Sequence, residues 1–167
     1  YGVSPWEINV IRSILDKRFQ TEDEEIENTY EEKFVSHLEI SFPYSFNSEF
    51  FKWFDYKEWD RLKGVFKEMK RRRGDGKAIR INLNFSGQPD INFVIESDES
   101  QWFKMEVEKI DFVVELLPYH LDEKNIPKDV KSVIYNFDQE AARWRLNTVF
   151  ANEKKFVNSQ KGWKLST

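Results

Sequence analysis

Cysteine is absent from this chain of 167 residues, and histidine occurs only twice. The lack of cysteine excludes disulfide bonds, thiolate nucleophiles and metal sites with sulfur ligands. His37 and His120 lie far apart and show neither HxH nor HxxxH spacing, so the sequence predicts no metal site. The signatures GxxxxGK[ST], GxGxxG and GxSxG are also missing, which removes the usual marks of phosphate loops, dinucleotide sites and nucleophile elbows. The sequence therefore predicts a protein that is not an enzyme and holds no cofactor.

Long apolar runs are missing as well. No segment approaches the roughly 20 apolar residues of a membrane span. The N-terminal stretch YGVSPWEINVIRSIL lacks the basic start and apolar core of a signal peptide. We therefore expect a cytoplasmic protein that does not bind membranes.

Acid–base catalysis needs carboxylates whose pKa values are shifted by their surroundings. Only Glu39 and Glu96 lie on predicted strands where a cleft could shift their pKa values in this way.

Aromatic residues, in contrast, are abundant: the chain has fifteen Phe, six Trp and six Tyr. With 40% hydrophobic residues it can build one sizeable core, so we expect a single α+β domain over residues 1–167. Large aromatic side chains either fill such a core or anchor an interface with a partner. If the chain binds a protein partner, Trp53, Tyr56 and Trp144 are the candidate interface anchors; otherwise they belong to the core.

Three segments show helical signals. The first begins at SPWE, where Ser4 and Glu7 form a capping box, and runs to about Phe19. The second covers Tyr56 to about Arg73 and ends at a glycine. The third covers about Gln101 to Leu117 and ends before a proline. The segment YSFNSEFFKWF, between the first two helices, is predicted to be a strand or an irregular turn.

Strand patterns fill most of the remaining chain. Residues 34–42 alternate, residues 79–85 and 91–95 form a hairpin, and SVIYNF, ARWRLNTVF, KKFVN and WKLS form a C-terminal meander. In the longest strand Trp144, Leu146, Thr148 and Phe150 are predicted to share one face, with Arg143, Arg145 and Asn147 on the other. The predicted fold is α+β, with about three amphipathic helices on one face of a mostly antiparallel sheet and Arg and Asn on the other.

The acidic residues concentrate in one segment. Residues 21–32 carry seven carboxylates and no cation, although the net charge of the whole chain is only -4. Such a segment is either a solvated linker or an acidic surface for a basic partner. For the second alternative, the predicted partner-binding residues are Glu22, Glu24, Glu25, Glu27, Trp53 and Tyr56.

A basic run covers the end of the second helix and the turn after it. Residues 67–80 contain seven cations against two carboxylates. Cations in a last helical turn are stabilised by the exposed carbonyl groups by about 0.3 to 1 kcal/mol each, which is a structural reason for the run. The alternative is a basic, aromatic-lined cleft for single-stranded DNA or RNA. Its predicted residues are Lys70, Arg71, Arg72, Arg73, Lys77, Arg80, Asn82, Asn84, Arg143 and Arg145.

The order of elements over Ile8 to Leu117 is helix, strand, long helix, hairpin, helix. Within it, WDRLKGVFKEM is followed by a polar linker and by INLNFSGQPDINF. This arrangement resembles that of the small bacterial immunity proteins that are encoded beside secreted toxins. The C-terminal meander is not part of the resemblance. What the resemblance implies is neutralisation of a toxin by occlusion, with no catalytic residues. A non-enzymatic protein-binding domain, with a basic toxin as a candidate partner, is thus the first hypothesis. Binding of single-stranded nucleic acid is the second.

Overall fold

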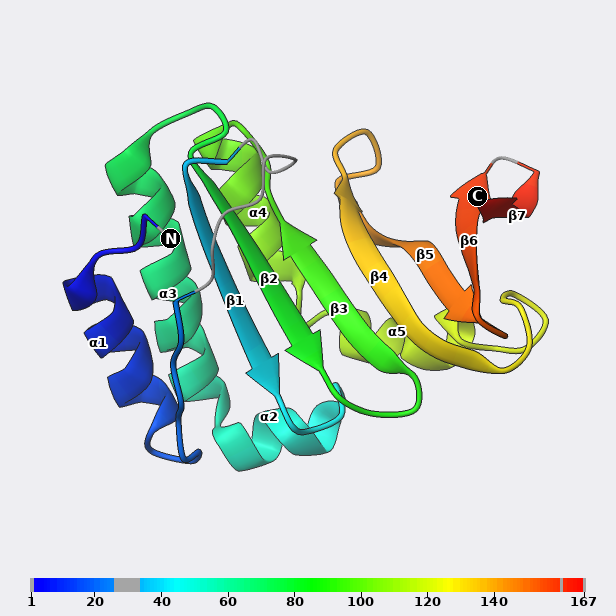
Figure 1. The fold of residues 1–167 in the computed structure, drawn as a ribbon, viewed down its shortest axis with the longest axis horizontal. Coiled ribbons are helices and arrows are strands. Elements are labelled where there is room, and N and C mark those ends of the chain that lie inside the picture. Colours follow the sequence, from blue (N-terminus) through cyan, green and yellow to red (C-terminus); the bar gives the residue numbers. More distant parts are fainter. Residues whose placement is uncertain (1, 26–33, 160, 167) are drawn as a thin grey trace.

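The computed structural model describes residues 2–25, 34–159 and 161–166. Within these ranges the fold is α+β (Figure 1). Its helices are α1 (Pro5–Leu15), α2 (Ser48–Phe54), α3 (Tyr56–Arg73), α4 (Ser100–Lys109) and α5 (Val113–His120). Its strands are β1 (Ser36–Phe42), β2 (Ile79–Phe85), β3 (Asp90–Ile95), β4 (Val130–Asp138), β5 (Arg143–Ala151), β6 (Lys154–Ser159) and β7 (Gly162–Ser166).

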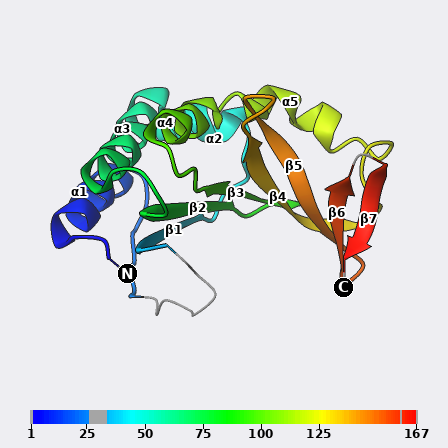
Figure 2. The same cartoon turned by 90° about the horizontal axis from the view of Figure 1, so that it is seen from above.

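The strands form one sheet in which the spatial order follows the chain order from β1 to β7. Four of the six neighbouring pairs are antiparallel, and β4 to β7 form the predicted meander. The pairs β1–β2 and β3–β4 are parallel, because α2–α3 and α4–α5 carry the chain back between them. The helices lie on one face of the sheet (Figure 2).

The core lies between this helical layer and the sheet. Strand β2 shows why: Ile79, Ile81, Leu83 and Phe85 are all buried, whereas the residues between them are half-buried on the open face. Helix α3 supplies the facing apolar side chains at spacings of three and four residues. They are Trp59, Leu62, Phe66 and Met69. These alternating and helical patterns confirm the predictions for both elements.

The helices differ from the prediction in number and extent. The first begins at the predicted capping box, since Ser4 and Glu7 exchange both hydrogen bonds, but it ends at Leu15. The predicted third helix is two helices, α4 and α5. Pro118 was predicted to end that single helix, but it lies inside α5. The segment predicted as a strand or irregular turn contains α2, which starts where the Asn47 side chain accepts a hydrogen bond from the Phe50 amide.

The predicted faces of β5 are wrong beyond Leu146. Leu146 lies opposite Tyr135, but Thr148 lies opposite Ile134, so one extra residue, Asn147, is accommodated as a bulge. The bulge moves Thr148 and the residues after it to the opposite face from the simple alternation.

In the described part of the chain, no helix combines the length and apolar character that crossing a bilayer requires.

Candidate functional site

Three aromatic side chains meet where α1, β1 and α2 end. They are Phe19, Tyr44 and Trp53, and we call this cluster the aromatic corner. The ring centroids of Tyr44 and Trp53 lie 4.7 Å apart, and that of Phe19 lies 5.7 Å from Tyr44 and 5.1 Å from Trp53. Tyr44 is 44% and Trp53 39% exposed. The corner therefore presents apolar surface to solvent.

The corner is held firmly from beneath. The Phe19 ring packs against the buried rings of Phe42 and Phe54, at centroid distances of 5.6 and 5.8 Å. The Arg18 side chain donates from Nε to the Trp53 carbonyl oxygen over 2.9 Å, which joins the end of α1 to α2. Because the rings are already fixed by the core, a partner would not have to order them on binding.

The acidic segment continues directly from the aromatic corner. Arg12 donates to the Asp23 carboxylate over 2.7 Å and to the Thr21 carbonyl oxygen over 3.4 Å, which ties the segment to α1. The side chains of Glu22, Glu24 and Glu25 are exposed. Glu27 lies outside the described residues. Exposed carboxylates thus begin three residues beyond Phe19 in the chain, on a segment that Arg12 holds against α1.

The other predicted anchors lie elsewhere. The Tyr56 ring is exposed but stacks on Phe51, with centroids 5.5 Å apart, and makes no ring contact with the corner. Trp144 is buried, and its indole nitrogen donates to the Glu106 carbonyl oxygen over 2.9 Å. Trp144 is therefore part of the core, and the prediction that it anchors a partner is wrong.

Two of the predicted nucleic-acid contacts are used inside the protein. Lys70 is buried, donates to the Gly76 carbonyl oxygen over 3.0 Å, and lies over the Phe103 ring. Arg73 makes two hydrogen bonds of 2.7 Å to the carboxylate of buried Glu7. A phosphate would have to break these contacts before it could use either cation.

The remaining predicted contacts are spread over the molecule. Arg71 bonds to Glu68, Arg72 lies over the Trp6 ring, and Lys77 is exposed on the loop after α3. On β2, polar partners on the open face engage Arg80, Asn82 and Asn84. Arg143 and Arg145 lie on β5, with two strands between it and β2. The described structure does not gather these residues into one cleft, as a nucleic-acid groove requires.

The predicted strand carboxylates lie on the open face. Asn84 donates to Glu39 over 2.7 Å, and Arg80 lies 3.6 Å from Glu96. The strongly buried carboxylates are instead Glu7 on α1, which Arg73 pairs with, and Glu106 on α4, which no motif in the sequence marks.

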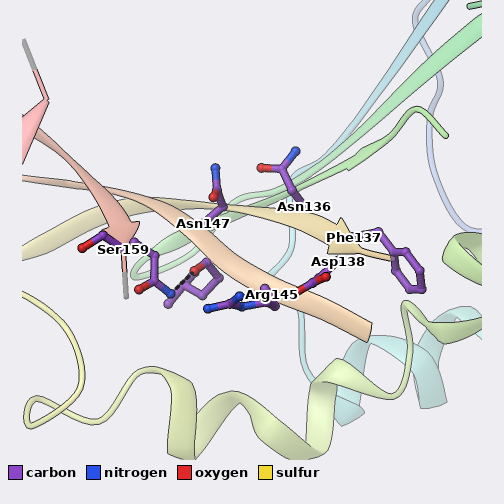
Figure 3. Close-up of a pocket in the computed structure, with 8 residues that line it drawn as sticks. Asn136, Phe137, Asp138, Arg145, Asn147 and Ser159 are labelled. Atoms are coloured by element: carbon purple, nitrogen blue, oxygen red, sulfur yellow. Dashed lines mark hydrogen bonds and ion pairs between the residues drawn. The ribbon is translucent and has the colours of Figure 1, made fainter. Parts of the chain in front are cut away.

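A small hollow of about 330 Å³ opens where β6 diverges from β5. Polar groups of Asn136, Arg145, Asn147 and Asn158 line it, and Figure 3 shows Asn136 and Asn147 pointing to the same side of the strands. Arg145 pairs with Asp138, and Asn158 donates to the Leu146 carbonyl oxygen. The volume is at the lower end for ligand pockets.

Glu106 is 2% exposed, and its carboxylate accepts hydrogen bonds from the Ser97 hydroxyl over 2.6 Å and the Ser97 amide over 3.2 Å. Burial raises the pKa of Glu106 to about 7 from its ordinary 4.5, although the Ser97 hydrogen bonds oppose the shift. Nearby Glu96 raises the pKa further. Burial lowers the pKa of Lys70, and the negative charge of Glu106 opposes part of this shift.

We expect this carboxylate to make folding stability depend on pH. Below pH 4.5 Glu106 is protonated in both states, and as pH rises to 7 only the unfolded chain loses the proton. The free energy of unfolding should fall by about 3 kcal/mol over this window, from a shift worth about 1.4 kcal/mol per pH unit. Glu106→Gln should remove the fall, since a carboxamide can keep both bonds to Ser97. Urea unfolding at pH 5, 6, 7 and 8 measures this, and equal slopes for the variant and the wild type would contradict it.

Comparison with known proteins finds no match: no protein-family model, no curated protein and no solved structure is similar to this chain. The resemblance to immunity proteins therefore stays a prediction.

Proposed function

We propose that the chain is a non-enzymatic protein-binding domain that takes a basic partner on its aromatic corner. The observation that carries the proposal is the pair of half-exposed rings of Tyr44 and Trp53, which pack on each other and on Phe19, a few residues before the exposed carboxylates of the acidic segment in the chain. Rings that rest on a core and expose one side are typical anchors of protein interfaces. Tyr and Trp also suit a surface that is solvated in the free protein and buried in a complex, because each combines an apolar ring with a hydrogen-bonding group.

The acidic charge of the chain supports a basic partner. Glu22, Glu24 and Glu25 are exposed on the segment that follows Phe19, and the whole chain is acidic. Exposed carboxylates of this kind attract a cationic protein over long distances and speed its association, whereas the rings contribute most once the complex has formed. The resemblance to immunity proteins suggests a basic secreted toxin as this partner, neutralised by covering its surface. Such occlusion needs no catalytic group.

The test begins with the product of the gene that neighbours this one in its genome. Trp53→Ala should weaken binding of that product at least about fivefold, because a central ring of an interface contributes more than about 1 kcal/mol. Titration calorimetry measures the change, and the affinity should also fall as salt is added. Growth of cells that express the neighbouring product should be rescued by the wild-type chain and rescued less by the variant.

Tyr56→Ala is the matched control, since Tyr56 is an exposed aromatic residue that does not touch the corner. It should leave the affinity unchanged. Equal losses for Tyr56→Ala and Trp53→Ala would show that the corner is not the centre of the interface. A neighbouring product that does not bind at all would contradict the immunity role.

A further inference from the structure

Helix α5 is apolar on its outer side as well as on its inner side. Val113 is buried, and Leu117 packs partly buried against the core. On the outer side, Leu116 is 45% and Tyr119 71% exposed, and Phe112, directly before the first residue of the helix, is 61% exposed. These three residues follow one another at spacings of four and three, so they form a stripe along one side of the helix. We call them the α5 stripe.

The stripe is unusual within this molecule. Helix α3, which packs in the same layer, exposes mainly charged side chains such as Lys57, Asp60 and Arg71. A helix of a soluble domain normally keeps its apolar residues on the side that faces the core. An apolar outer side with aromatic members marks an interaction surface.

The helix is a rigid platform for this stripe. The His120 ring nitrogen Nδ1 lies 2.9 Å from the hydroxyl oxygen of buried Tyr135 on β4. Burial raises the pKa of Tyr135 and, with Arg143 adding to it, burial lowers the pKa of His120. Both groups are therefore neutral at pH 7, and the hydrogen bond between them tethers the end of α5 to the sheet without adding a cation beside the stripe.

The charges along the same segment are mostly negative. From residue 111 to residue 124 the chain carries Asp111, Glu115, Asp122 and Glu123 against the single cation Lys124. Asp111 is neutralised by Lys63 at 3.2 Å, whereas Glu115, Asp122 and Glu123 are exposed. The stripe is thus an apolar surface with an acidic border.

This border decides between the candidate occupants. Two copies of the chain that paired their α5 helices antiparallel about a two-fold axis would bring the two Glu115 flanks to the same side of the interface, where like charges repel. A segment with Lys or Arg beside its apolar residues has complementary charge. We propose that the α5 stripe is a docking surface for a short amphipathic, cationic segment of a partner protein. The α5 stripe is a separate surface from the aromatic corner.

The probe is a synthetic 18-residue peptide of Leu and Lys with helical spacing, and the comparison peptide has Glu in place of every Lys. We expect the cationic peptide to bind the full chain at least tenfold more tightly than the anionic one, measured by fluorescence anisotropy. Leu116→Ser and Tyr119→Ser should each weaken it at least fivefold. Val35→Ser is the matched control, because Val35 is an exposed apolar residue before β1, at the opposite end of the sheet, and should leave the affinity unchanged.

Several results would overturn the inference. Equal affinity for the two peptides would remove the charge argument, and absence of binding would remove the surface. Loss of binding in Trp53→Ala with full binding in Tyr119→Ser would place the peptide on the aromatic corner, so the two sites can fail separately. Dimerisation of the chain alone that Tyr119→Ser abolishes, measured by sedimentation, would make a second copy the occupant. Circular dichroism confirms that each variant is folded before it is scored.

Discussion

Replacing Arg73 with Ala is expected to lower the free energy of unfolding by about 3 to 5 kcal/mol at pH 7, because it leaves a buried carboxylate without its cation. Glu7 is 2% exposed, and the hydrogen bonds from Arg73, against the opposing effect of burial, lower its pKa to about 2. Arg73 also donates to the Ser36 hydroxyl and to the Gly2 and Met69 carbonyl oxygens. One side chain therefore joins α1, α3, the N-terminal residues and β1.

Arg71→Ala is the matched control for this variant. Arg71 is exposed and, among the described residues, pairs with Glu68, three residues earlier on the same helix. Such a solvent-exposed pair contributes little to stability, so Arg71→Ala should unfold almost like the wild type. Chemical unfolding of both variants provides the measurement, and the double variant Glu7→Gln with Arg73→Ala should recover part of the loss. If Arg73→Ala were as stable as Arg71→Ala, the buried pair would not hold the helices together.

Trp59→Ala is expected to cost about 3 to 5 kcal/mol of stability, since it opens a cavity between α3 and its neighbours. Trp59 is fully buried, its ring contacts Phe51 at a centroid distance of 5.1 Å, and its indole nitrogen donates to Asp111 over 3.3 Å. Trp59→Phe keeps most of the volume and should cost less. Thermal and urea unfolding compare the two.

Trp53→Ala sets the contrast for the same experiment. Trp53 lies on the half-exposed aromatic corner, so its removal leaves no closed cavity and should cost only about 1 kcal/mol. An equally large loss in Trp53→Ala and Trp59→Ala would mean that both rings are core, and the corner would then not be a surface built for binding.

Local signals in the sequence were enough to predict α1, α3 and the first three strands. A capping box, a long helical period and strict alternation are each written in neighbouring residues. Helix α2 was missed because seven residues are too few to show a period, and its aromatic residues face more than one neighbour. The bulge at Asn147 was missed because its cause is the register with β4, which alternation in one strand does not contain.

The candidate site was predictable only in part, for the same reason. Trp53 stood outside the helical pattern and was expected to be exposed, but its ring partners Phe19 and Tyr44 come from other segments. Likewise, the sequence places Arg71 and Arg73 in one basic run and cannot tell them apart. The structure separates them, because the carboxylate that holds Arg73 lies 66 residues away on α1.

The sheet, finally, was built in the order of the chain, and this has a consequence for how the protein folds. Each strand after β1 pairs with the strand that precedes it in the chain. No strand therefore has to be inserted between two strands that come earlier in the chain. During synthesis each new strand can meet a finished edge as it leaves the ribosome. The long loop closures are confined to the two parallel pairs, where α2–α3 and α4–α5 intervene. We therefore expect these two crossovers to set the folding rate and the C-terminal meander to add rapidly afterwards.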